Sequence, residues 1–508
     1  MPDSRGPPAD VVNRSADMSV HRLLHHTLVY TVASVIYRAA SFVLVPLYVR
    51  SLPAAEYGRL ELITTTAMIL GALLSSGVAH STMRFYFEYD GMADRKAVVS
   101  TALMAAGALL AAGAGLAVLF SAQLSLTVLG TSAYTTAFRL AAVALVFELA
   151  REISLAYVRA TERSALFAVM SLVQLFAQVG ASIYAVVYLR LGVTGILAAN
   201  LFATAIVASL LAAFTFRECG TAFRPDLIPP VVRYGYPLVL TGLSGTIVHS
   251  MDRYFAGILV SVQAVGIYAL AIRVAAVLFV LVNTPFTNSY GPYRFSIMRQ
   301  AGAPRIYANV LTLYALAGSF IVVLLSAACR DALRLLAAPE YSEAHRLAPI
   351  LLAGGLLSGI TYCFQTGLYV QKRTRTLLYI SCGSGLVNLL ALVTFGTLFG
   401  LFGIACSAGV ASLYAACHTY RAAQRLLPVP YDIGRLVRIA LTAGIVIAVV
   451  MQIHMDSIWQ SLALKLSIAA AYPMLLIVTG GISASDLERV RTVCRTAALR
   501  LQPRIFTP

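Results

Sequence analysis

Residues 376–420 read TLLYISCGSGLVNLLALVTFGTLFGLFGIACSAGVASLYAACHTY and contain no acidic or basic side chain other than His418. A helix needs about 20 apolar residues to cross the hydrocarbon core of a bilayer. The stretch is therefore long enough for two crossings, which we place at 376–398 and 402–420. We expect the glycine-containing turn between them to return the chain across the membrane.

The rest of the chain has the same character. Of its 508 residues, 59% are apolar and only 12% are charged, and the mean hydropathy is +0.81. Ordinary soluble proteins are about 25% charged. We therefore predict an all-α polytopic membrane protein with about 14 transmembrane helices. The other predicted spans are 27–48, 60–81, 97–123, 134–153, 165–189, 194–216, 234–259, 264–290, 306–328, 344–370, 436–455 and 458–480.

The basic residues predict the orientation of these spans. The chain has 38 Lys and Arg against 21 Asp and Glu, a net charge of +17. Basic residues are retained on the cytoplasmic side during insertion, and a cytoplasmic N-terminus places most of them inside. Both termini are therefore predicted to be cytoplasmic, and topology explains the excess charge without a nucleic-acid partner. The basic residues left outside are Arg50, Arg59, Arg190, Arg330, Arg334 and Arg346.

An internal repeat with a shift of about 208 residues runs through the chain. Gly58 maps onto Gly266, and Gly192-Val193-Thr194-Gly195-Ile196 maps onto Gly400-Leu401-Phe402-Gly403-Ile404. Two further matches, at shifts of 212 and 210, join 157–163 to 369–375 and Arg84-Phe85 to Arg294-Phe295. Six spans separate each pair, so the halves must have the same orientation in the membrane, as in the parallel repeats of transporters.

The repeat predicts the domain organisation. We expect a cytoplasmic segment at 1–26, an N-terminal lobe of six spans at 27–220 and a C-terminal lobe of six spans at 221–425. Spans 13 and 14, at 426–482, lie outside the duplication. The tail at 483–508 is predicted to form a basic amphipathic helix on the inner leaflet.

Several motifs resemble the polysaccharide, or oligosaccharide-lipid, flippases of the multidrug/oligosaccharidyl-lipid/polysaccharide (MOP) exporter superfamily. They are the opening stretch YRAASFVLVPLYVRSLPAAEYG at 37–58, Asp252-Arg253-Tyr254 followed by Val265-Gly266-Ile267-Tyr268, and the Gly-x-x-Gly turns. The resemblance covers about residues 27–425. Fourteen spans also resemble the peptidoglycan-precursor flippases of that superfamily, in which two extra helices help form a groove for the lipid tail. No motif assigns the chain to that branch.

The resemblance implies two MATE-like six-helix lobes with alternating access. It further implies transfer of undecaprenyl-pyrophosphate-linked oligosaccharide from the cytoplasmic to the periplasmic leaflet of a bacterial inner membrane, for lipopolysaccharide or exopolysaccharide synthesis. The implied partners are the lipid-linked oligosaccharide, membrane lipids and polysaccharide polymerase or assembly proteins.

Charged residues inside spans are candidate sites because each costs about 2.5 to 3.5 kcal/mol to insert. Arg38, Arg253 and Arg273 lie within spans, and an arginine suits a pyrophosphate because its paired donors match phosphate oxygens. Arg84, at the cytoplasmic end of a span, could recruit the incoming phosphate or simply anchor the helix. Alternatively, Asp252 pairs with Arg273, which would leave Arg253 as the freer phosphate ligand.

Other polar residues have weaker claims. His249 and Asp252 share a helix face, a spacing that would permit proton coupling. Arg139 and Lys465 are expected to extend to the outer interface. The seven cysteines show no metal-ligand spacing, so we expect no metal and no cofactor.

Other functional classes are less well supported by the sequence. An enzyme acting on lipid-linked sugars needs catalytic groups on a sizeable aqueous loop, whereas the longest outside loop, at 330–343, carries only Asp331, Glu340 and Glu343. No Gly-Lys-Ser or Gly-Lys-Thr sequence suggests an ATPase. We therefore expect a transporter, not an enzyme. A multidrug antiporter of the same superfamily and a non-transporting scaffold remain open alternatives.

Overall fold

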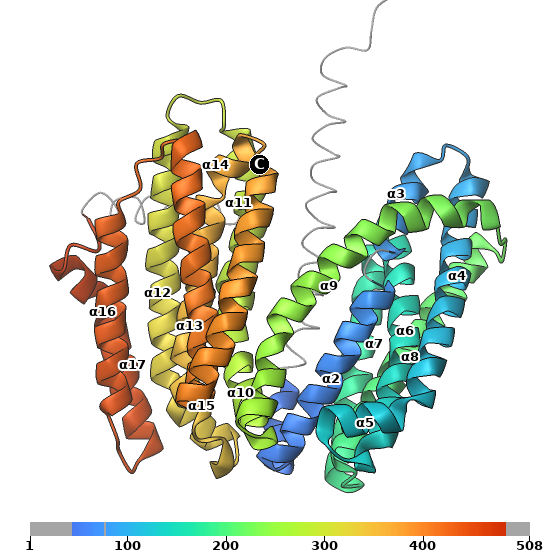
Figure 1. The fold of residues 1–508 in the computed structure, drawn as a ribbon, viewed down its shortest axis with the longest axis horizontal. Coiled ribbons are helices and arrows are strands. Elements are labelled where there is room, and N and C mark those ends of the chain that lie inside the picture. The colour runs from blue at the N-terminus through green and yellow to red at the C-terminus, as the bar shows by residue number, and fades with distance from the viewer. Residues whose placement is uncertain (1–42, 76–77, 484–508) are drawn as a thin grey trace, which may run out of the picture. The chain divides into compact units, whose positions relative to one another are not determined.

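The computed structural model describes residues 43–75 and 78–483, and in these residues all regular secondary structure is helical. The chain divides into two compact units. The first contains the described residues up to Tyr254 together with Val262–Gly266, and the second contains Phe255–Ser261 and the described residues from Ile267 onward. Figure 1 shows the helices of each unit.

The helices up to the end of the first unit are α2 (Ala54–Ser75), α3 (Val78–Glu88), α4 (Met92–Leu119), α5 (Ser121–Leu129), α6 (Thr135–Ala160), α7 (Ser164–Ile183), α8 (Gly192–Cys219) and α9 (Ile228–Leu259). They are followed by α10 (Val262–Leu278), α11 (Thr284–Ser296), α12 (Ala303–Leu336), α13 (Ala344–Phe364), α14 (Thr366–Val370), α15 (Thr374–Leu426), α16 (Ile433–Gln452) and α17 (Ile458–Val478). Short helical turns are η1 (Ser132–Tyr134), η2 (Tyr184–Tyr188), η3 (Pro225–Leu227), η4 (Phe279–Asn283) and η5 (Pro339–Tyr341).

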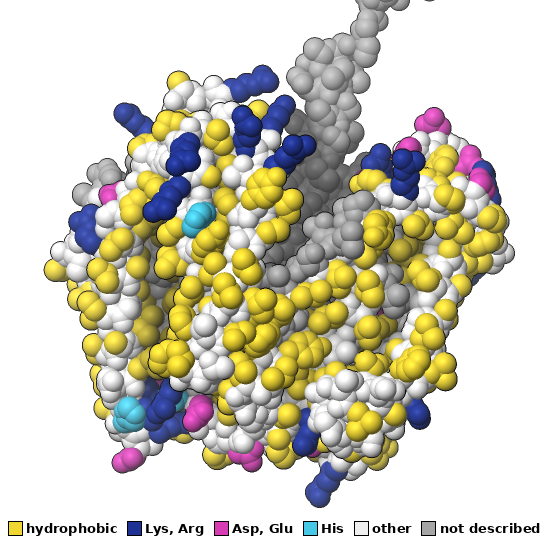
Figure 2. Space-filling model, in the orientation of Figure 1, with side chains coloured by type: hydrophobic (Ala, Val, Ile, Leu, Met, Phe, Trp, Pro, Cys, Tyr) yellow, Lys and Arg dark blue, Asp and Glu magenta, His cyan; other side chains and the backbone are white. Residues whose placement is uncertain are grey.

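Helices form most of every predicted span from 60–81 onward, although residues 76–77 are not described and α16 ends at Gln452, before the predicted end of span 436–455. Most of span 27–48 lies outside the described residues. Within the described part of the chain, nine helices are long and apolar enough to cross a membrane. Large apolar side chains face outward, with Val478 83% exposed. Figure 2 shows hydrophobic side chains across the middle of the visible face and Lys and Arg gathered toward its ends. The chain is a multi-pass membrane protein; the count of fourteen spans stays a prediction.

In the first unit, α6 lies at the centre and packs against α4 and α8. The α4–α6 contact buries an aliphatic cluster that includes Leu103 and Ile153, and α7 and α8 add a second that includes Phe167 and Leu211. These side chains are apolar on the helix faces that meet. Because lipid is as apolar as these side chains, close van der Waals packing holds the helices together.

In the second unit, α12 has the central position, beside α13, α16 and α17 (Figure 1). The contact with α16 and α17 buries an apolar cluster closed by Tyr472, whose hydroxyl donates to Ser319 at 3.0 Å and to the Ile439 carbonyl at 3.3 Å. The two C-terminal helices are thus packed on α12. The predicted domain boundaries at 220 and 425 stay predictions.

The repeated glycines occupy equivalent backbone positions. A Cβ on Gly58 would lie 2.0 Å from the Val262 carbonyl oxygen, and a Cβ on Gly266 would lie 2.0 Å from the Ala54 carbonyl oxygen. Ala54 and Val262 differ by the same 208 residues as the two glycines, so the starts of α2 and α10 cross symmetrically. Only glycine permits so close an approach of two backbones.

The second glycine signature has the same conformation in both halves. Gly192 has φ +56° and Gly400 has φ +57°, a left-handed conformation that glycine adopts at little cost. Gly192 begins α8, and Gly400 interrupts α15 between the two spans predicted there. The internal repeat inferred from four short sequence matches therefore appears in the backbone.

Candidate functional site

Three largely buried charged residues of the first unit form a cluster between α2 and α9. The Nε of Arg253 donates to Oε1 of Glu61 at 2.8 Å, and its Nη1 donates to Oδ1 of Asp252 at 3.4 Å. The side chains of Arg253, Glu61 and Asp252 are 13%, 8% and 16% exposed. One arginine is thus held between two carboxylates in what we call the Arg253 cluster.

The Arg253 cluster lies on a firmly joined pair of helices. Next to Arg253, the Tyr254 hydroxyl is 2.8 Å from the Thr66 hydroxyl, and Thr66 donates to the Leu62 carbonyl within α2. Glu61 also lies one turn after Gly58, where the start of α2 crosses the start of α10. The glycine crossing therefore helps to set the position of the carboxylate that meets Arg253.

The prediction that Arg253 would be the freer phosphate ligand differs from what the structure shows. Arg253 is engaged by Glu61, the second residue of the predicted span 60–81, which is not among the candidate residues predicted from the sequence. An acidic residue inside an apolar span is itself a sequence signal for a candidate site. The cluster therefore includes two carboxylates that accept hydrogen bonds from one guanidinium.

Of the other predicted site residues, Arg84 lies away from this cluster. The guanidinium of Arg84 on α3 is 53% exposed, lies 3.5 Å from Glu88 and stacks 4.3 Å from the Tyr234 ring centroid. Tyr234 and Arg253 are 19 residues apart on α9, or about 28 Å along the helix at 1.5 Å per residue. Arg273 is partly buried on α10. Arg38 lies outside the described residues, as does the side chain of His249.

A buried arginine in the second unit was missed. Arg294 on α11 is 5% exposed, and its guanidinium lies 4.2 Å from the Tyr369 ring centroid and 4.9 Å from those of Phe295 and Tyr362. Its Nε and Nη1 are buried without a hydrogen-bond partner. The topology prediction places Arg294 among the basic residues on the cytoplasmic side, and its repeat match to Arg84 is the sequence signal for a further role.

Lys465 does not extend to the interface as predicted. Its side chain is 2% exposed, and its Nζ donates to Oδ2 of Asp331 at 2.7 Å. Ser461 donates to the same oxygen at 2.9 Å. Asp331 was assigned to an outside loop, but α12 continues to Leu336 and buries it. Because the acid comes from α12 and the lysine from α17, neither sequence neighbourhood revealed the pair.

Metal-ligand sets are absent from the part of the chain that the structure describes. No three His, Cys, Asp or Glu side chains in residues 43–75 and 78–483 lie close enough together to hold a metal ion. The six cysteines in these ranges are free thiols. The charged clusters therefore offer ion pairing and anion binding as their chemistry.

Residues 23–298 match the model of a protein family described as "Polysaccharide biosynthesis protein". This match spans more than half of the chain. The chain belongs to the polysaccharide biosynthesis protein family. The predicted family resemblance is thereby confirmed, while the comparison with curated protein sequences finds no significant match.

Several solved structures share the fold of this chain. The lipid II flippase MurJ in an inward closed conformation aligns with a TM-score of 0.74 and 12% identity, over 91% of this polysaccharide biosynthesis protein and 99% of MurJ. An inward-facing multidrug resistance MATE transporter of the MOP superfamily aligns at 0.58 and 15% identity, over 80% and 95% of the two chains. VcmN from Vibrio cholerae in its bent form aligns at 0.51 and 15% identity, over 82% and 98%. The MOP exporter fold is thus confirmed.

Proposed function

We propose that this protein is a flippase that moves an undecaprenyl-pyrophosphate-linked oligosaccharide from the cytoplasmic to the periplasmic leaflet of a bacterial inner membrane, for surface polysaccharide synthesis. The observation that carries the proposal is the family match over residues 23–298. The fold shared with a lipid II flippase over 91% of the chain supports it. Both termini are cytoplasmic in this proposal, as the distribution of basic residues favours.

The Arg253 cluster suggests how such a protein could couple binding to movement. A guanidinium held by carboxylates can exchange them for pyrophosphate, because both anions accept its paired N–H donors. Protonation of Glu61 or Asp252 would weaken their hold on Arg253 and favour that exchange. A proton or ion gradient could then drive transport through the occupancy of this one cluster, since a ligand shifts a conformational equilibrium only by binding one state more strongly.

We assign roles to the other arginines from their positions along the predicted spans. Arg38 and Arg273 are proposed as further ligands of the head-group phosphate within the spans. Arg84 and its repeat match Arg294 are proposed to receive the incoming head group at the cytoplasmic ends of the two halves. His249 is proposed to assist proton transfer to Asp252. The protein acts as a transporter without a cofactor, next to polymerase or assembly proteins that use its product.

A multidrug cation antiporter is the second candidate, favoured by one observation. The cluster contains two largely buried carboxylates, Glu61 and Asp252, and buried carboxylates suit cationic substrates. The two candidates differ in the charge of their substrate. A transport assay that offers both a lipid-linked anion and an organic cation therefore separates them.

The test is leaflet transfer in proteoliposomes. Purified protein is reconstituted with a fluorescent undecaprenyl-pyrophosphate oligosaccharide, and the label that becomes accessible in the opposite leaflet is followed over time. Wild type should transfer the label, whereas Arg253→Ala should slow transfer at least about tenfold, as expected for loss of a charge-assisted contact. Arg163→Ala is the matched control, because Arg163 pairs with Glu218 at 42% exposure, away from this cluster.

Three results would count against the proposal. Absence of transfer by folded wild-type protein with several sugar donors would overturn it. Uptake of an organic cation in exchange for protons would favour the antiporter. Full transfer by Arg253→Ala would be consistent with a flippase but would show that transport does not need Arg253.

A further inference from the structure

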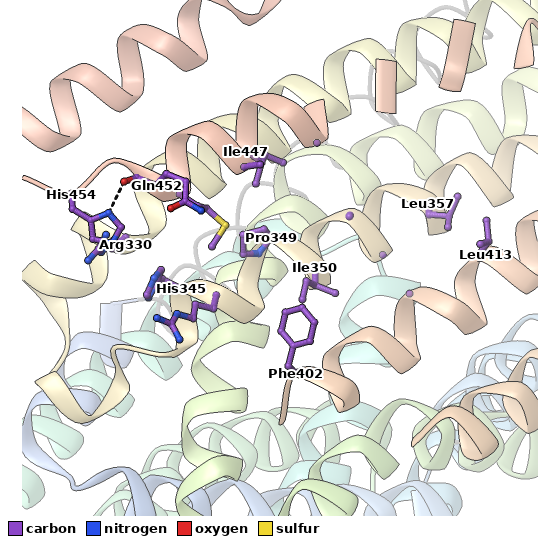
Figure 3. A pocket seen from close by; sticks show the side chains of 17 residues that line it. Arg330, His345, Pro349, Ile350, Leu357, Phe402, Leu413, Ile447, Gln452 and His454 are labelled. Atoms are coloured by element: carbon purple, nitrogen blue, oxygen red, sulfur yellow. Dashed lines mark hydrogen bonds between the residues drawn. The ribbon is translucent and has the colours of Figure 1, made fainter. Parts of the chain in front are cut away.

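A cavity of about 1040 Å³ lies within the second unit. Its walls come from the end of α12 and from α13, α15 and α16, helices that belong to this unit alone. Figure 3 shows that its lining is sorted by polarity. Arg330, His345, Gln452 and His454 lie toward one end, and Leu357 and Leu413 lie at the other.

The apolar part of the cavity exists because small residues line it. A Cβ added to Gly409 or to Gly444 would meet no other atom within 4 Å. A Cβ on Gly354 would meet only the Gly409 Cα, at 3.9 Å. Neighbouring side chains are apolar and partly open to the surroundings, with Phe402 51% and Leu413 54% exposed. In a membrane protein, such a hollow faces lipid and has the chemistry of an acyl-chain site.

The polar part of the cavity is cationic. Arg330 and Arg346 both line it, and neither pairs with a carboxylate among the residues that the structure describes. The Nη1 of Arg330 is buried and has no hydrogen-bond partner. The nearby acid, Asp331, is already bonded to Lys465 and Ser461. A buried donor without a partner carries a free-energy cost that a bound anion would relieve.

Two histidines complete this end. The Nδ1 of His345 contacts the Ser342 carbonyl, and the Nδ1 of His454 lies 2.6 Å from the Gln452 carbonyl. If each Nδ1 donates its proton to that carbonyl, the Nε2 remains available to a ligand. The cationic end thus offers arginine donors together with imidazole groups that can accept or donate a hydrogen bond.

Membrane topology does not account for these charges. The distribution of basic residues places this end of α12 and α13 on the outer side, where few Lys and Arg are expected. Half of the basic residues predicted outside, namely Arg330, Arg334 and Arg346, nevertheless belong to this one segment. Two of these three line the cavity. Their concentration at the mouth of an apolar hollow needs a different explanation from orientation.

We propose that this cavity binds one anionic phospholipid of the surrounding membrane. Its phosphate lies between Arg330 and Arg346, and an acyl chain runs past Gly444 toward Leu413. The combination of an unpaired cationic end with an apolar shaft fits one molecule that has both an anionic head and a chain. Free phosphate would leave the shaft empty, and a zwitterionic phospholipid would bring a cation next to the two arginines.

The proposal is tested with purified full-length protein in detergent micelles by native mass spectrometry. Phosphatidylglycerol, phosphatidylcholine, undecaprenyl phosphate and inorganic phosphate are titrated separately, and the bound fraction is measured for each. Wild type should bind one phosphatidylglycerol at least about tenfold more tightly than phosphatidylcholine, because charge-assisted hydrogen bonds to the phosphate are retained only without a competing cation.

Two variants test the two parts of the cavity separately. Arg330→Gln with Arg346→Gln should weaken phosphatidylglycerol binding at least about tenfold by removing both charges. Gly444→Leu should do so by filling the shaft, and the space around Gly444 lets this variant fold. The control is Arg334→Gln, since Arg334 donates to the Met455 carbonyl and does not line the cavity. Thermal unfolding confirms that each variant is folded.

Several outcomes would overturn the proposal. Equal binding of phosphatidylglycerol and phosphatidylcholine would show that the arginines do not select an anionic head group. Unchanged binding of phosphatidylglycerol to folded Gly444→Leu would show that the apolar part of the cavity does not hold an acyl chain. Full competition by inorganic phosphate would leave an anion site without a lipid, and a clear preference for undecaprenyl phosphate would assign the cavity to a polyprenyl chain instead. None of these results depends on whether the protein transfers oligosaccharide between leaflets.

Discussion

Two buried ion pairs, one in each compact unit, differ in how completely they are closed. Lys465 and Asp331 in the second unit are 2% and 0% exposed and lie 2.7 Å apart, and Arg334 lies 3.9 Å from the other carboxylate oxygen of Asp331. Arg253 in the first unit is 13% exposed and shared by Glu61 and Asp252. A fully closed pair holds helices together, whereas a partly open cluster can be reached by a ligand that replaces one of its partners. Burial of a charge is therefore a poor guide to function unless its accessibility is also known.

The largest effect is expected from breaking the closed pair. Lys465→Met leaves the Asp331 carboxylate buried without its main partner and should lower the free energy of unfolding by about 3 to 5 kcal/mol. The double variant Lys465→Met with Asp331→Leu should recover most of this loss, since no buried charge remains. Chemical unfolding in mixed micelles measures both. A double variant as unstable as the single one would show that the pair does more than neutralise itself.

A smaller effect is expected at the Arg253 cluster. Arg253→Met leaves Glu61 and Asp252 without their shared cation, and the loss should be about 1 to 3 kcal/mol because partial exposure lets water reach the carboxylates. Adding Glu61→Leu should restore only part of it, since Asp252 remains. The same unfolding measurement applies. Recovery as complete as in the Lys465 and Asp331 double variant would contradict the difference drawn between the two sites.

The glycine crossing next to Glu61 tests whether backbone position matters to the cluster. A Cβ on Gly58 would overlap the Val262 carbonyl oxygen at 2.0 Å, so Gly58→Ala should cost about 1 to 3 kcal/mol. Gly266→Ala, its repeat match, should cost a similar amount. Gly107→Ala is the control, because a Cβ there meets nothing within 4 Å. If Gly58→Ala were as harmless as this control, the close crossing would be refuted.

The smallest effect is expected at an exposed pair. Arg224 lies 2.8 Å from Asp226 and 2.5 Å from Asp94, and Arg224 lowers the pKa of Asp226 below its ordinary value of 3.8. A lowered folded-state pKa contributes stability above pH 3.8 that is lost as pH falls through the folded-state pKa. Arg224→Gln should therefore be slightly less stable than wild type at pH 7 and equal to it in strong acid. Thermal unfolding at both pH values checks this, and a difference that persists in acid would argue against the ion pair as its source.

Much of the fold was predictable because it depends on local patterns. Apolar runs of 20 residues specify helices, and the glycines at 58, 192, 266 and 400 mark backbone positions that only glycine fills well. The repeat that relates these glycines is visible in the sequence alone. The pairing of residues on different helices was not predictable from the sequence, because Lys465 and Asp331 are 134 residues apart and Arg253 and Glu61 are 192 residues apart. Which helix faces meet is decided by packing, and periodicity within one helix carries no information about its neighbour.

The candidate site was only partly predictable for the same reason, because contacts between distant helices are not visible in the sequence. Arg253 and Asp252 were identified because charges are rare in spans, but the role of Arg253 depends on Glu61 from a distant helix. Arg294 was hidden by the assumption that a basic residue near a span end faces water, and the aromatic rings that enclose it come partly from α14 and the end of α13. A sequence lists the charges, while burial and pairing decide what each one can do.

The most direct test compares leaflet transfer by two double variants in proteoliposomes containing the fluorescent lipid-pyrophosphate oligosaccharide. Arg253→Met with Glu61→Leu removes the guanidinium and one of the two carboxylates of the Arg253 cluster, and Lys465→Met with Asp331→Leu removes the closed pair. We predict that the first loses transfer at least about tenfold, whereas the second stays within about twofold of wild type. Equal rates in the two folded variants would contradict the claim that the Arg253 cluster, and not the closed pair, serves transport.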